Sequence, residues 1–388
     1  MQFNLKLTEK GAIYVTSQQP VDIHGKPYNR SLLVGVLLIG TFCTILNQTL
    51  LTTALPTLMK EFDISASSVQ WLTTGFLLVN GIMIPISAWL INKFSSKKLY
   101  ITAMSTFLIG TIICFVAQDF GMLLTGRLVQ AAGVGVSMPL LQTIMLSIFP
   151  PEKRGAAMGT TGIVIGLAPA LGPTLSGWII DSYTWRDLFG MVIPIVVLVL
   201  ILASFLMKNV IQLSNPSIDV LSVILSTLGF GSLLYGFSSV GDKGWGSPQV
   251  YGFLIVGAIV LCLFTYRQLH LEQPFLELRV FKSKVFTVAA ILSGVTNMAM
   301  IGAEMVLPLY IQNIRGESAF HSGLMLLPGA LVMGLMMPVT GRIFDKIGAR
   351  RLAITGMFIL TAATLPFAFL TKATPIIYII VLYAIRMF

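Results

Sequence analysis

Apolar runs of about 20 residues or more recur along the whole chain, and they constrain its fold more than any other feature. A helix of this length is what a hydrocarbon core about 30 Å thick requires. The runs are continuous and do not alternate at every second residue, which favours helices over a membrane β-barrel. Only 10% of the residues are charged, too few to cover a water-facing surface. The sequence therefore predicts an all-α polytopic membrane protein.

Hydropathy read in windows of about 19 residues predicts the individual spans. We expect them near residues 31–54, 69–91, 99–117, 121–148, 155–180, 187–207, 218–240, 249–267, 285–312, 320–341 and 351–371. A last apolar segment, IIYIIVLYAIRMF, begins near residue 376 and stops in mid-span. We therefore expect C-terminal helices that are missing from this chain. Residues 1–30 are polar and show no signal peptide, because they contain no apolar core.

The positions of lysine and arginine predict the orientation, since positively charged loops stay in the cytoplasm. Of the 25 basic residues, 18 lie in the N-terminal segment and every second loop, and five lie in the opposite loops. We therefore expect a multi-pass protein of the plasma membrane with a cytoplasmic N-terminus. The net charge of +10 requires no nucleic-acid partner, because anionic lipids of the inner leaflet account for it.

Two features recur late in the chain and indicate an internal repeat, as transporters often carry. The loop sequence SAWLINKFSSKKL aligns with TGRIFDKIGARRL, and a lone arginine within an apolar run recurs two spans later in each copy, at Arg127 and Arg386. We predict a cytoplasmic segment at 1–30, a six-helix half at 31–210, two inserted helices with a cytoplasmic loop at 211–284, and an incomplete second half at 285–388.

Four motifs resemble those of the major facilitator superfamily. TGRIFDKIGARR resembles the loop signature G-x-L-x-D-x-x-G-R-[KR]-[KR], and RLVQAAGVG resembles the fourth-span signature R-x-x-Q-G-x-G. GLAPALGPTLSG resembles the antiporter signature G-x-x-x-G-P-x-x-G-G, and LNQTLLTTALP resembles the first-span signature L-D-x-T-[IV]-x-x-x-A-L-P. From about residue 31 onward the chain resembles the fourteen-helix drug:proton antiporter family (EmrB/QacA type). Its overall pattern is closest to the lincomycin-resistance-type multidrug exporters.

The resemblance implies a major facilitator fold, with two six-helix halves plus two inserted helices, in the bacterial cytoplasmic membrane. It implies multidrug efflux by drug:proton antiport through alternating access, with lipophilic, often cationic, drugs and protons as partners. We expect a monomer surrounded by membrane lipids, with no cofactor and no metal. The alternatives are a proton-coupled exporter of a lipid, peptide or metabolite, a proton symporter, and a non-transporting membrane scaffold. An enzyme is not expected, because the chain lacks G-x-x-x-x-G-K-[ST], H-E-x-x-H and G-x-S-x-G motifs.

Two positions in the spans point to proton coupling. Asn47 stands where the family usually has Asp and cannot titrate, whereas Glu304 is the only carboxylate clearly within a span. Low dielectric favours the neutral form of a carboxyl group, which would let Glu304 take up and release protons. Arg127, expensive in a membrane, is expected to face the central cavity and to tune a proton-carrying group or a bound ligand. The alternatives are a hydrated Glu304 in an outer vestibule and an Arg127 that snorkels to the surface.

The remaining candidate residues belong to a substrate cavity and to gating elements. For the cavity we expect Asn47, Gln48, Gln130, Met298 and Met305, methionine being able to form an adaptable wall or merely to fill the core. The gating loop contains Asp345, Gly341, Gly348, Arg350 and Arg351, and the antiporter motif contains Gly172, Pro173 and Gly177. Small residues let helices approach closely and prolines bend them, which serves ordinary packing as well as a pliable interface. The first-half loop has Asn92 in place of Asp345, so a latch would depend on the second copy.

Overall fold

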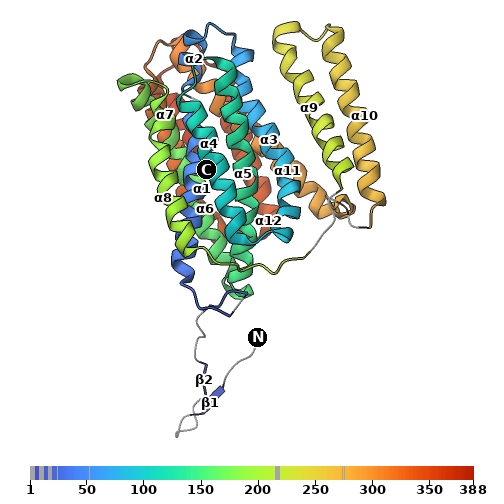
Figure 1. The fold of residues 1–388 in the computed structure, drawn as a ribbon. Helices are drawn as coiled ribbons and strands as arrows, with labels where there is room; N and C mark the ends of the chain where they lie inside the picture. The colour runs from blue at the N-terminus through green and yellow to red at the C-terminus, as the bar shows by residue number, and fades with distance from the viewer. Residues whose placement is uncertain are drawn as a thin grey trace.

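The computed structural model describes residues 5–7, 13–15, 20–23, 25–51, 53–214, 219–272, 274 and 276–388. Within the helices, the description does not extend to the side chains of residues 151, 152, 156, 170, 242, 338, 342 and 344–346. Figure 1 shows a bundle of long helices with the N-terminal segment hanging below it. In the described part, eleven helices are long and apolar enough to cross a membrane, and they coincide with the eleven spans that the sequence predicts up to residue 371.

The first half consists of six long helices and two short ones. The long helices are α1 (Arg30–Leu50), α3 (Ala66–Lys93), α4 (Ser96–Phe115), α5 (Phe120–Ile148), α6 (Pro151–Ser182) and α8 (Val192–Leu206), and the short ones are α2 (Leu55–Glu61) and α7 (Asp187–Gly190). Asn29, Ser65 and Asp119 begin three of them, and each side chain accepts a hydrogen bond from a backbone N–H in the first turn. One apolar core runs through all of these helices.

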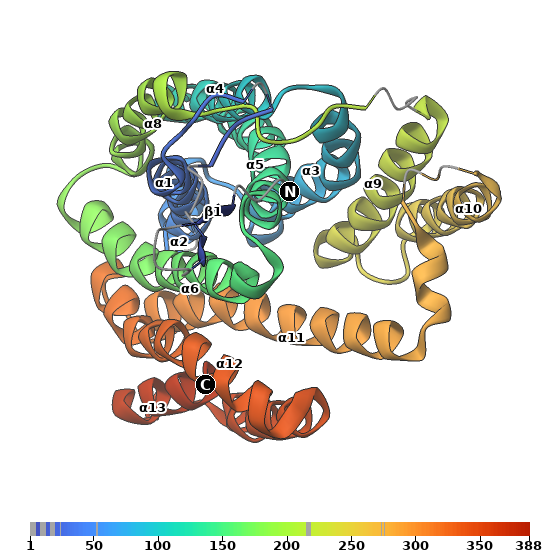
Figure 2. The same cartoon turned by 90° about the horizontal axis from the view of Figure 1, so that it is seen from below.

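The two helices that follow form a hairpin at the side of the bundle. They are α9 (Val220–Lys243) and α10 (Pro248–His270), and Figures 1 and 2 show them beside α3 and apart from the rest of the first half. The rings of Trp71 in α3 and Tyr235 in α9 lie 5.9 Å apart. A short 3-10 segment, η1 (Leu278–Lys282), leads from the hairpin to the second half.

The second half contains α11 (Lys284–Leu309), which continues into the π-helical turn η2 (Tyr310–Ile314), then α12 (Ala319–Thr364), η3 (Leu365–Phe369) and α13 (Ile376–Arg386). α12 covers two predicted spans in one helical run, but its backbone breaks at Gly348, where φ is +79°. Glycine adopts this left-handed conformation without steric cost. The predicted loop between these spans is therefore a sharp kink and not an extended connection.

A small hairpin in the N-terminal segment departs from the all-α prediction. β1 (Leu5–Leu7) pairs antiparallel with β2 (Ile13–Val15), so that Leu5 lies opposite Val15. The strand sequences LKL and IYV contain β-branched and aromatic residues that suit a strand. The prediction treated this segment only as polar, whereas the membrane-spanning part is helical as expected.

Candidate functional site

Arg127 lies inside the first half and is enclosed by four helices. Its side chain is only 1% exposed. Nη1 donates hydrogen bonds to Oδ1 of Asn47 in α1 and to Oε1 of Gln130 in α5, both at 2.8 Å. The guanidinium also lies over the ring of Phe76, 4.4 Å from its centroid, and Gln130 donates in turn to Thr111 in α4 at 2.8 Å. Arg127 therefore joins α1, α3, α4 and α5 through partners, and it does not snorkel to the surface.

The charge of Arg127 is held by neutral groups. Among the described residues, no carboxylate lies within ion-pair distance of its guanidinium. Amide oxygens and an aromatic face take that place, and both stabilise a cation less than a carboxylate would. Nδ2 of Asn47 is buried and has no hydrogen-bond partner within the described part of the chain. The aspartate usual in the resembling family would put an ion pair where Asn47 stands.

The antiporter motif in α6 packs against both halves. A Cβ added at Gly172 would overlap the Thr49 side chain in α1, and a Cβ added at Gly177 would overlap the carbonyl oxygen of Ala319 in α12. Gly172 thus serves packing within the first half, and Gly177 serves packing between the halves. α6 and α12 contact each other more extensively than any other pair of helices.

Glu304 lies at the junction of the two halves. It borders a small cavity together with Thr49 of α1, Pro169 and Pro173 of α6, and Tyr383 of α13. The space open to the centre of a water molecule is about 10 Å³, which is room for about one water. Pro169 and Pro173 lie inside α6, and neither has a backbone N–H to donate to the preceding turn of the helix. The only carboxylate predicted within a span therefore lies at the interface between the two halves.

Arg386 is the charged neighbour of Glu304, with which it interacts electrostatically. Its side chain is 6% exposed. Nε donates to Oγ1 of Thr364 at 3.0 Å and Nη2 donates to the carbonyl oxygen of Ala299, while Nη1 has no hydrogen-bond partner among the described residues. The lone arginine of the second half thus has a carboxyl group in its electrostatic surroundings, although no ion pair joins Arg386 to Glu304 among the described residues.

The other predicted cavity residues are scattered. Gln48 is half-buried in α1. Met305 packs against the core of the first half, next to Glu304, whereas Met298 on the same helix is 75% exposed. The structure therefore brings Met305 to the interface with Glu304 and places Met298 on an open face of α11. Their roles in a substrate cavity stay predictions.

The predicted gating loop is described only in part. Gly348 forms the kink in α12, Gly341 lies in the helix before it, and Arg350 and Arg351 are exposed in the helix after it. The side chain of Asp345 lies outside the described residues, so the proposed latch stays a prediction. In the first-half copy, Nδ2 of Asn92 donates to the carbonyl oxygen of Ala88 at 2.9 Å, which caps the end of its own helix.

Several residues at the interface were missed by the sequence analysis. Thr49, Pro169 and Tyr383 border the Glu304 cavity, yet none was a candidate. Arg386 was noticed only as the repeat of Arg127. Its position in that repeat was a usable signal, because a charged residue inside a span usually faces a partner.

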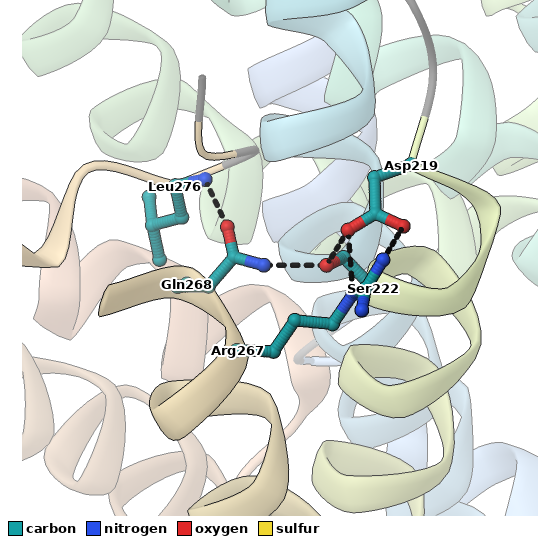
Figure 3. Close-up of polar contacts among 5 residues, drawn as sticks. All are labelled: Asp219, Ser222, Arg267, Gln268 and Leu276. Atoms are coloured by element: carbon teal, nitrogen blue, oxygen red, sulfur yellow. Dashed lines mark hydrogen bonds and ion pairs between the residues drawn. The ribbon is translucent and has the colours of Figure 1, made fainter. Parts of the chain in front are cut away.

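A polar cluster fastens the two inserted helices to each other and to the linker that follows (Figure 3). Arg267 of α10 donates to both carboxylate oxygens of Asp219, at 2.9 and 3.0 Å. The guanidinium, with help from the Ser222 hydroxyl, lowers the pKa of Asp219 to about 2. Gln268 donates to Ser222 and accepts from the backbone N–H of Leu276 at 2.9 Å. The cluster therefore makes α9, α10 and the linker into η1 one unit.

Comparison with known proteins agrees with this architecture. Two solved structures of POT family transporters, one titled as a complex with a thioalcohol-conjugated peptide, share the fold with TM-scores of 0.68 and 0.66. The first is 16% identical and is aligned over 95% of this chain and 82% of its own; the second is 14% identical, over 95% and 81%. At this level of identity the likeness concerns the fold alone.

Sequence relatives are much nearer. The uncharacterised MFS-type transporter YcnB of Bacillus subtilis is 56% identical over 94% of this chain and 77% of its own length. The lincomycin resistance protein LmrB of Listeria monocytogenes is 43% identical over 92% and 75%, and the multidrug export protein EmrB of Escherichia coli K12 is 31% identical over 84% and 64%. The family model of the Major Facilitator Superfamily matches residues 37–388. The chain therefore belongs to the Major Facilitator Superfamily of membrane transporters.

Proposed function

We propose that the protein exports lipophilic drugs from the bacterial cytoplasm in exchange for protons, by alternating access between its two halves. The observation that carries this proposal is the position of Glu304, which borders the cavity between α6 of the first half and α11, α12 and α13 of the second. A carboxyl group at a moving, poorly hydrated interface can bind a proton in one state and release it, or hold a cation, in the other.

Arg127 takes part in the proposed coupling through α1. Its hydrogen bond to Asn47 anchors α1 at a point two residues before Thr49, and Thr49 borders the Glu304 cavity. Arg386 is the nearer charge and would compensate Glu304 when the carboxyl group is ionised. Protonation of Glu304 would then remove the negative charge near Arg386, which gives the junction of the halves two charge states.

The contacts between α6 and α12 support alternating access. α6 and α12 pack closely at Gly177 and at Gly166, where an added Cβ would lie 3.1 Å from Gly334. The opposite ends of the two helices are less closely packed. There a Cβ added at Gly155, Gly159 or Gly341 would meet no described atom within 4 Å. Those ends carry basic loops, so with the N-terminus in the cytoplasm the conformation would be closed outside and open inside.

A transport assay in proteoliposomes tests the proposal. Purified protein is reconstituted, a pH gradient is imposed, and uptake of ethidium and of lincomycin is followed together with internal pH. The relatives named for lincomycin resistance and multidrug export motivate these two probes. We expect drug accumulation to require the gradient and to dissipate it, with no effect of ATP.

The alternatives predict other outcomes in the same assay. If the gradient drives movement of a lipid, peptide or metabolite and neither drug is transported, the protein is a proton-coupled exporter of a different substrate. Proton and solute movement in the same direction would indicate symport. Absence of any flux from protein that is correctly inserted would favour a non-transporting scaffold and contradict the proposal.

A further inference from the structure

Asp181 occupies a position that its own helix does not explain. It lies in the last turn of α6, where the helix dipole and the unpaired carbonyl groups make a negative charge unfavourable. Instead, its Oδ2 accepts a hydrogen bond of 3.0 Å from the backbone N–H of Phe320, in the first turn of α12. The first turn of a helix is where a negative charge is favourable. The carboxylate of one half therefore caps a helix of the other half.

This contact occurs beside two close approaches between the backbones of the two halves. A Cβ at Gly177 would overlap the carbonyl oxygen of Ala319, and a Cβ at Gly323 would overlap that of Pro173. Beside them, Oγ1 of Thr174 donates to the carbonyl oxygen of Gly323 at 3.0 Å. All of these contacts lie at the end of the bundle opposite the basic loops, which we call the outer end. The bond from Phe320 to Asp181 can form only while the outer ends of α6 and α12 touch.

The charged groups near Asp181 pair with other residues and not with Asp181. Arg186 pairs with Glu61 at 3.6 Å within the first half, and His321 lies 3.1 Å from Glu317 within the second. No lysine, arginine or histidine lies within ion-pair distance of Asp181 among the described residues. A carboxylate bonded to a backbone N–H makes a charge-assisted hydrogen bond, which is stronger than a bond between neutral groups.

We propose that Asp181 is a positioning residue of the transport cycle, which stabilises the state closed at the outer end by capping α12 from the other half. The proposal deepens the transport function proposed above and rests on its alternating access. It assigns to Asp181 neither substrate nor proton binding. Its loss shifts the balance of the two states towards the one open at the outer end.

Accessibility of a buried reporter measures this balance without drug or proton gradient. Leu326 is 2% exposed and borders the closed cavity, so Leu326→Cys in a Cys262→Ser background reports outer opening to a membrane-impermeant maleimide. In full-length protein in cells whose proton gradient has been abolished with a protonophore, we expect Asp181→Ala to raise the labelling rate on the order of tenfold, the equivalent of losing one charge-assisted hydrogen bond. Asp181→Glu, which keeps the carboxylate, should recover part of the closed state.

The controls separate the contact from general damage. Asp187 follows shortly after the end of α6, and among the described residues its carboxylate accepts hydrogen bonds only from Thr184 of its own half. Asp187→Asn should therefore leave labelling unchanged. Phe320→Pro removes the donor N–H at the second helical position, where proline is tolerated, and should raise labelling, whereas Phe320→Ala keeps the N–H and should raise it less. Unchanged labelling in Asp181→Ala, or an equal rise in Asp187→Asn, overturns the proposal. Because no cargo enters the assay, a failure of the drug:proton antiport proposal would leave this result intact.

Discussion

The lone arginines of the two halves have different partners, and this difference is the main asymmetry at the scale of single residues. Arg127 is held by the amide oxygens of Asn47 and Gln130, and Arg386 interacts with the carboxylate of Glu304. A buried cation without a counter-charge depends on each hydrogen bond that it makes, because the low dielectric makes unpaired charge expensive. Within the described residues, neutral groups alone therefore stabilise the positive charge of Arg127, whereas Arg386 has the carboxyl group of Glu304 in its surroundings.

Substitution of Asn47 tests how much Arg127 depends on neutral acceptors. Asn47→Leu should lower the free energy of unfolding by about 1.5–3 kcal/mol, the usual worth of a hydrogen bond to a charged group. Unfolding in detergent by denaturant measures the change. The matched control is Asn297→Leu, since Asn297 is exposed and donates only to Ser293 of its own helix within the described residues. Equal stability of the two variants would show that Asn47 does not hold Arg127.

At this scale the sequence predicts less than the structure shows. A charged residue in a span signals that a partner exists, and for Arg127 two of the partners, Asn47 and Gln130, were already candidates. The sequence does not say which helices face each other, so the cavity that Glu304 shares with Thr49 and Tyr383 could not be predicted. That cavity depends on how α1, α11 and α13 pack across the two halves.

The helix α6 is the element on which the junction of the halves depends. Its glycines divide between a face on α1, at Gly172, and a face on α12, at Gly166 and Gly177. Towards its basic end, Gly155 and Gly159 face open space in the described structure. Because Gly177 has no side chain, the backbone of α6 can contact the backbone of α12 at Ala319, which a larger residue would prevent.

Two substitutions in α6 separate contact from helix propensity. Gly177→Leu should block closure of the outer end and reduce transport strongly, because its side chain would displace Ala319. Gly155→Leu in the same helix should leave the structure in this conformation intact, and its effect on transport should appear only if the basic ends close during the cycle. Efflux of ethidium from cells, normalised to protein in the membrane, distinguishes them. Normal efflux in Gly177→Leu would contradict the role of this contact.

The polar cluster that joins α9 and α10 gives a prediction for how stability depends on pH. Arg267 lowers the pKa of Asp219 from its reference value of 3.8 to about 2. A carboxyl group whose pKa falls on folding contributes stability above the pKa of the unfolded chain, and that contribution is lost as pH falls towards the folded value. The stability that wild type has over Asp219→Asn should therefore be constant near neutral pH and shrink below about pH 4. Melting temperatures of both proteins in detergent across this range provide the test, and a difference independent of pH would refute it.

At the level of elements the sequence was a good guide. The apolar runs correspond to the eleven long helices, because helix length in a membrane is set by bilayer thickness and not by tertiary contacts. The kink at Gly348 and the hairpin at Leu5–Leu7 and Ile13–Val15 were not predicted. Hydropathy does not report φ angles, and short strands outside the membrane leave little trace in it.

At the scale of the whole molecule, the two halves meet chiefly along α6 and α12, with Glu304 beside the junction. α9 and α10 lie to one side, fastened to each other by the Asp219 cluster and packed on α3 (Figures 1 and 3). A rocking movement of the halves would break the contacts at the outer end and change the surroundings of Glu304 together. Opening of the outer end and the state of the Glu304 carboxyl group are thereby linked in the proposed transport cycle.

Proton release on drug binding measures whether Glu304 takes part in this cycle. Ethidium and lincomycin are added separately to purified protein in weakly buffered detergent solution, and released protons are measured at several pH values. Wild type and Glu272→Gln, a change in the exposed linker after α10, should release protons in a saturable manner near the pH at which Glu304 is protonated. Glu304→Gln should bind drug without releasing protons. Equal proton release from Glu304→Gln and wild type would contradict the assignment of Glu304 as the coupling group.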